Sequence, residues 1–169
     1  YYELAKILDA GGAITVDSTL SSYDVRRLID KGGERVTVEC EGFAAYDVRK
    51  FAAAGAILHL DNSFSAYDLQ KLASSAGEKA IVLCLGISAY DVKKICTAGA
   101  KVVLDSTFSA YDVLKTAQIG GQRTVVIEDG FSEYDIRRFI AAGARIVKEW
   151  PLPYDERKRR FGVLYGEGN

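Results

Sequence analysis

The sequence predicts an α/β fold built from tandem βα units. A tyrosine followed by an acidic residue recurs with steps of 21, 23, 21, 23, 21, 23 and 20 residues, at Tyr2, Tyr23, Tyr46, Tyr67, Tyr90, Tyr111, Tyr134 and Tyr154. Two steps (21 + 23) make a period of 44 residues. Between these tyrosines, helix patterns alternate with short β-rich runs. A fixed period of this length is typical of stacked supersecondary units.

Each repeated tyrosine lies in the first turn of a predicted helix. In the segment 64–69, Ser65 is the expected N-cap, and Asp68 stands at the position of its capping partner. Serines occupy the same place at Ser21, Ser88, Ser109 and Ser132. Ala44 departs from the pattern because it has no side-chain oxygen. Apolar residues then follow at helical spacing and form one buried stripe.

Glycines predict where the helices end, and β-rich runs follow them directly. The glycines are Gly33, Gly55, Gly77, Gly99, Gly121 and Gly143. The predicted strands are 14–16, 36–38, 58–60, 81–83, 102–104, 125–127 and 146–147. Strands that alternate with helices over short connections indicate a parallel sheet with right-handed crossovers.

Two architectures fit this order: a closed parallel (βα)8 barrel and an open, curved α/β solenoid of the leucine-rich-repeat kind. We favour the barrel, because an eighth helix start at Tyr154 and an eighth strand at 163–165 complete the count. The leucine-rich consensus is not found in register. We expect one domain over residues 1–169, with residues 150–169 as an atypical terminal unit.

With eight units in a 44-residue double repeat, the chain resembles the TIM-barrel superfold, in particular idealised four-fold repeat barrels. The resemblance covers nearly the whole chain and concerns architecture. It implies a (βα)8 fold and carries over no substrate and no catalytic residue.

Composition excludes several classes of partner. The formal net charge is -1, which gives no overall attraction to nucleic acid or anionic membranes. No apolar run is long enough to span a bilayer, and the residues after Tyr1 lack the pattern of a signal peptide. We therefore expect a cytoplasmic protein with reduced cysteines and without membrane or nucleic-acid partners.

Polar side chains stand where each predicted strand ends. In a barrel these residues would form one ring at the catalytic face: Asp17, Cys40, Asp61, Cys84, Asp105, Glu128, Glu149 and Tyr165. The carboxylates could serve as general acids or bases, and Asp61 and Asp105 could ligate a divalent metal. The alternative is that the aspartates form Asx turns that recur because the repeat recurs.

The single histidine, His59, lies in a predicted strand. It could pair with Cys40 or Cys84 as a nucleophile and base, or be an ordinary interior side chain. Glu39 interrupts a column that is otherwise apolar, and the repeat pattern does not explain it. The repeated tyrosines precede a basic residue by four positions, which predicts stacking of the cation on the ring; the alternative is a polyanion-binding surface.

Three functions remain open from the sequence. The first is a repeat-built (βα)8 scaffold, engineered or derived by duplication, with no identifiable activity. The second is an acid/base or metal-dependent enzyme that uses the carboxylate ring, and a divalent metal is then the one cofactor expected. The third is an open solenoid that binds a protein or a polyanion.

Overall fold

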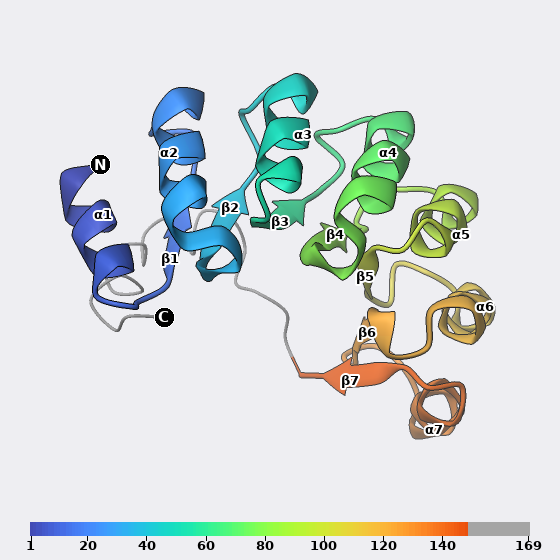
Figure 1. The fold of residues 1–169 in the computed structure, drawn as a ribbon. Helices are drawn as coiled ribbons and strands as arrows, with labels where there is room; N and C mark the ends of the chain where they lie inside the picture. Colours follow the sequence, from blue (N-terminus) through green and yellow to red (C-terminus); the bar gives the residue numbers. More distant parts are fainter. Residues whose placement is uncertain (149–169) are drawn as a thin grey trace. The chain divides into compact units, whose positions relative to one another are not determined.

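The computed structural model describes residues 1–148, in which seven α-helices alternate with seven parallel strands (Figure 1). The helices are α1 (Tyr2–Asp9), α2 (Ser22–Gly32), α3 (Ala45–Ala53), α4 (Ala66–Ala76), α5 (Ala89–Thr97), α6 (Ala110–Gly120) and α7 (Glu133–Ala141). The strands are β1 (Ile14–Val16), β2 (Val36–Glu39), β3 (Ile57–Leu60), β4 (Ala80–Leu83), β5 (Lys101–Leu104), β6 (Thr124–Ile127) and β7 (Arg145–Val147). The predicted α/β fold, in which helices alternate with parallel strands in βα units, is confirmed. The predicted eighth unit lies outside the described residues.

The described chain forms two compact units, Tyr1–His59 and residues 60–148. In the first unit, β1 pairs with β2 and β2 with β3, all in parallel. In the second unit, β4, β5, β6 and β7 pair in chain order, again in parallel. Within each unit the helices lie side by side and cover one face of the strands (Figure 1). Whether the chain is one domain, as predicted, stays a prediction.

The helix starts follow the predicted capping pattern. The side-chain oxygen of each capping serine accepts a hydrogen bond from the backbone N–H three residues on; the caps are Ser21, Ser65, Ser88, Ser109 and Ser132. Ala44 holds the same backbone conformation, with φ -69° and ψ 147°, but makes no side-chain cap bond. The local sequence therefore determines these starts.

The alternation of 21 and 23 residues arises at the helix ends. Helices α2, α4 and α6 have 11 residues and continue into a 3-10 turn, at Gly33–Arg35, Gly77–Lys79 and Gly121–Arg123. Helices α3, α5 and α7 have 9 residues and lack that turn. The predicted terminal glycines all have positive φ, for example 56° at Gly33 and 99° at Gly55. Positive φ is the conformation that glycine adopts at least cost.

Arginines in two of these turns bind the end of the preceding unit. Nη1 of Arg35 donates to the carbonyls of Leu8 and Gly12, both at 2.8 Å. Arg123 makes the same kind of contact with the carbonyls of Cys96 and Ala100. Each guanidinium thus adds a hydrogen bond to a helix-end carbonyl that already accepts a backbone N–H, from Gly11 at Leu8 and from Gly99 at Cys96.

Within each unit, strand pairing advances by one residue from strand to strand. Val16 is the last residue before the strand-end Asp17, yet it pairs with Val38, which stands two before the strand-end Cys40. The other pairs within the two units, such as Glu39 with His59, show the same offset. Because side chains alternate between the faces of a strand, equivalent positions in neighbouring strands point to opposite faces. Within each unit, the strand-end residues therefore alternate between the two faces of the strands, and their grouping into a catalytic ring stays a prediction.

Burial follows this rule. Val16, Val38 and Leu58 lie in one row across β1 to β3 and are fully buried under the helices. Thr15 and Thr37, in the next row, are only partly buried.

In the described part of the chain, no helix has the length and apolar character that a bilayer span requires.

Candidate functional site

The strand-end aspartates lie in tight turns and bind their own backbone. Oδ1 of Asp17 accepts the N–H of Thr19 at 2.9 Å and also its hydroxyl. Asp61 and Asp105 accept the N–H two residues on, at 2.9 and 3.0 Å. These are the Asx turns that the sequence offered as the alternative to a carboxylate site. A catalytic role for the three aspartates stays a prediction.

The strand-end cysteines do not join the aspartates. The side chains of Cys40 and Cys84 are fully buried, and their Sγ atoms lie 3.4 Å from the carbonyls of Val38 and Val82. Cys40 and Cys84 follow those valines by two residues, so they lie on the helix-covered face. Burial raises the pKa of the Cys84 thiol far above its ordinary value, which keeps it protonated and unreactive.

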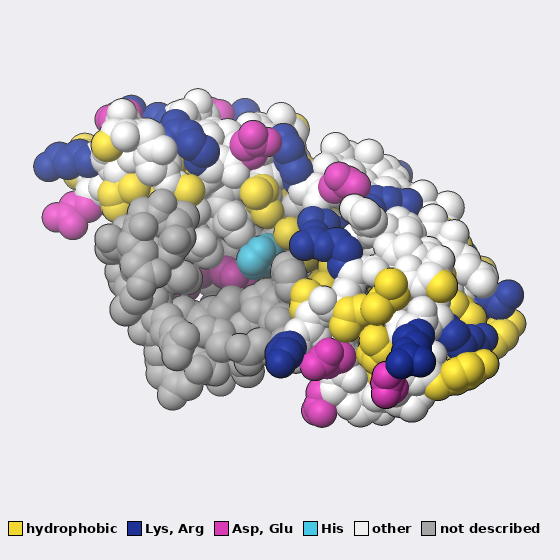
Figure 2. Space-filling view, turned by 90° about the horizontal axis from the view of Figure 1, so that it is seen from below, with side chains coloured by type: hydrophobic (Ala, Val, Ile, Leu, Met, Phe, Trp, Pro, Cys, Tyr) yellow, Lys and Arg dark blue, Asp and Glu magenta, His cyan; other side chains and the backbone are white. Residues whose placement is uncertain are grey.

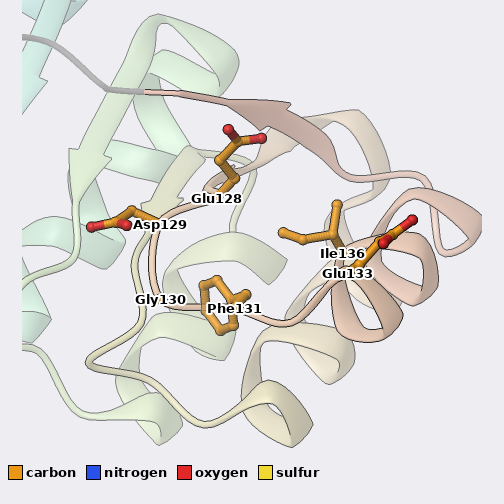
Figure 3. Close-up of a pocket in the computed structure, with 6 residues that line it drawn as sticks. All are labelled: Glu128, Asp129, Gly130, Phe131, Glu133 and Ile136. Atoms are coloured by element: carbon orange, nitrogen blue, oxygen red, sulfur yellow. The ribbon is translucent and has the colours of Figure 1, made fainter.

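Glu128 is exposed and lines a surface pocket of about 390 Å³ together with Asp129, Phe131, Glu133 and Ile136. Figure 3 shows its carboxylate and that of Glu133 on opposite sides of Ile136, and Asp129 directed away from both. The three carboxylates therefore do not converge on one point. Glu149, also predicted as a site residue, lies outside the described residues.

Metal ligation receives no geometric support in residues 1–148. No group of three or more His, Cys, Asp or Glu side chains in this range is placed to hold a metal ion. The predicted ligands Asp61 and Asp105 instead have oxygens engaged in their own turns.

Two titratable side chains on adjacent strands, Glu39 and His59, lie in contact. Nδ1 of His59 lies 2.9 Å from Oε1 of Glu39, and the two residues are register partners on β2 and β3. The Glu39 side chain is 7% exposed and that of His59 is 23% exposed. The imidazole (cyan) is visible from outside in Figure 2. An ionised carboxylate only accepts, so Nδ1 is then the donor of this bond, and in a neutral ring the lone pair is on Nε2.

Within residues 1–148, this pair has no counterpart at the two equivalent register positions. The same register position holds Leu83 and Val103 in β4 and β5, and Ile127 and Val147 in β6 and β7. Sequence reasoning named His59 and noted that Glu39 breaks an apolar column. It missed their contact, because it assumed that neighbouring strands are aligned without an offset. The contact found for His59 is thus with a carboxylate, whereas the sequence left open a pairing with a cysteine or an ordinary interior side chain.

The outer helix faces carry the predicted stacks of cation on tyrosine. Side-chain nitrogens lie 4.3 Å from the ring centre in the pair Lys50–Tyr46 and 4.2 Å in Lys94–Tyr90. The pairs at Tyr23, Tyr67, Tyr111 and Tyr134 are between 5.2 and 5.5 Å. These bases are therefore partly engaged within their own helices.

Comparison with known proteins gives no family. No protein-family model matches the chain, and no curated protein matches it in sequence. A presumed phosphonomutase of Burkholderia cenocepacia J2315 is similar in structure, with 15% identity, a TM-score of 0.47, and coverage of 98% of this chain and 88% of that one. A presumed lyase/mutase of the same organism has 13% identity, a TM-score of 0.40, and coverage of 94% and 87%. Neither similarity assigns an activity to this chain.

Proposed function

We propose that this protein is a βα-repeat scaffold whose repeated polar residues build turns and helix starts. The observation that carries the proposal is the bonding of Asp17, Asp61 and Asp105, which recur every 44 residues. In each of them, a carboxylate oxygen accepts a hydrogen bond from a backbone N–H of its own turn. A catalytic centre needs different groups in different roles, whereas these positions repeat one group in one structural role.

The test separates the charge of these aspartates from their hydrogen-bonding oxygen. Asparagine keeps the oxygen that accepts the turn hydrogen bond and removes the charge, whereas alanine removes both. We compare two double variants. The first carries Asp61→Asn and Asp105→Asn, and the second carries Asp61→Ala and Asp105→Ala. Thermal unfolding of each is measured with EDTA and then with Ca²⁺, Mg²⁺, Mn²⁺ or Zn²⁺.

A scaffold predicts that the asparagine variant unfolds close to the wild-type midpoint. The alanine variant should lose about 1 kcal/mol for each hydrogen bond removed. No metal should raise the midpoint of the wild type through these residues. The proposal fails if a metal stabilises the wild type by mass action and the asparagine variant loses that stabilisation.

A further inference from the structure

We propose that Glu39 and His59 form a proton-transfer site in which His59 is a general base toward a small uncharged ester. The proposal goes beyond the scaffold role and concerns a register pair whose two equivalents in the described strands are apolar. His59 Nδ1 and Glu39 Oε1 lie 2.9 Å apart on adjacent strands.

The fold itself does not need this pair. The equivalent partners Leu83–Val103 and Ile127–Val147 are apolar, so the same sheet position is satisfied by ordinary aliphatic packing. The Glu39 side chain is 7% exposed, so its carboxylate lies mostly out of contact with solvent. A polar pair at a position that aliphatic residues fill in the equivalent described pairs points to a chemical role.

The geometry suits a base. Glu39 accepts the Nδ1–H of His59 and holds the ring in the tautomer that leaves the lone pair on Nε2. The His59 side chain is 23% exposed, so a small molecule can approach the ring. Glu39 acts through His59 and is the positioning residue, as in other pairs of a base and an orienting carboxylate.

The neighbouring side chains bear on the substrate class. Within the first unit, Thr15, Thr37 and Ile57 lie on the same face of the strands as the pair. A threonine hydroxyl can donate a hydrogen bond to a carbonyl oxygen, and Ile57 offers an apolar contact. These three neighbours carry no charge, which suits an uncharged acyl compound.

The reaction step is hydrolysis. Nε2 of His59 takes a proton from water while the water oxygen attacks the ester carbonyl carbon. The tetrahedral intermediate then breaks its bond to the leaving oxygen, and the proton on Nε2 passes to that oxygen or to solvent. One ester and one water give one acid and one alcohol, and His59 returns to its starting state.

The first measurement is hydrolysis of p-nitrophenyl acetate at neutral pH by the full chain and by His59→Gln. His59 is the single histidine, so this substitution removes every imidazole from the protein. The control is the double variant Glu39→Leu with His59→Val, which copies the Leu83–Val103 pair and is expected to fold. Its rate gives the background from lysines.

We expect His59→Gln to fall to the rate of this double variant, about 100-fold below the wild type, the low end of positioned acid–base catalysis. The proposal is overturned if a folded variant keeps the wild-type rate. It is also overturned if the wild type is no faster than free 4-methylimidazole at equal concentration.

A second readout tests Glu39 apart from activity. The ¹⁵N spectrum of the neutral ring should show the Nδ1–H tautomer in the wild type and a mixture of tautomers in Glu39→Leu. An unchanged tautomer in Glu39→Leu would show that the carboxylate does not orient the ring and would contradict its assigned role.

Discussion

At the scale of single residues, burial changes the pKa of two cysteine thiols. Cys84 and Cys96 are fully buried, and desolvation is the main cause that raises the pKa of each thiol. The unfolded chain releases these protons near the ordinary value of 9.0, whereas the folded chain holds them to higher pH. Above that pH the unfolded state binds fewer protons, so folding stability falls as pH rises.

We predict that Cys84→Ala reduces this alkaline loss of stability. In the wild type, Cys84 contributes a loss of about 1.4 kcal/mol for each pH unit above its ordinary pKa. The measurement is urea unfolding across that range, comparing slopes against pH, because the alanine variant also loses packing. Equal slopes in the two proteins would contradict the assignment.

At the scale of elements, α3 differs from its equivalents by one missing oxygen. Ala44 has the backbone conformation of an N-cap, and Ser88, at the same place 44 residues on, bonds the N–H of Asp91. The backbone of α3 is thus already arranged for a cap that its side chain cannot supply.

We predict that Ala44→Ser stabilises the protein by about 1 kcal/mol, the usual value of a serine cap. Ser88→Ala is the matched control and should lose a similar amount. In thermal unfolding this corresponds to a change of about 2–4 °C for a chain of this size. A loss in Ser88→Ala without a gain in Ala44→Ser would show that α3 is limited by something other than its cap.

The sequence predicts the helices and strands, but it does not predict the contact between Glu39 and His59. The serine caps, terminal glycines and strand positions depend on a few neighbouring residues, and all seven strands were predicted within about two residues at either end, the usual uncertainty of element boundaries. The contact between Glu39 and His59 depends on how two strands align, which no local pattern encodes. The same missing offset placed Cys40 and Cys84 with the aspartates, although their side chains lie under the helices.

At the scale of the whole molecule, the closed barrel and the open solenoid differ at β1. In a closed barrel a strand at 163–165 would pair with β1, whereas in a solenoid that edge of β1 stays unpaired. An unpaired strand edge exchanges its amide hydrogens with solvent and invites pairing with other chains.

We predict that the amides of Ile14–Val16 exchange more slowly in the full chain than in a chain ending at Lys148. Hydrogen exchange followed by mass spectrometry measures this, and the amides of Val36–Glu39 are the internal control, because β2 has partners on both sides. Equal exchange of β1 in both chains would favour the open form.

The one-residue advance between neighbouring strands also limits how the number of βα units can change. Adding or removing a single βα unit would turn every later strand over, exposing its buried row and burying its polar one, so only pairs of units can be gained or lost. This explains why the sequence repeats every 44 residues. Eight such advances would sum to eight, the shear with which eight parallel strands close into a barrel. The one-residue advance within each of the two units agrees with that value per strand.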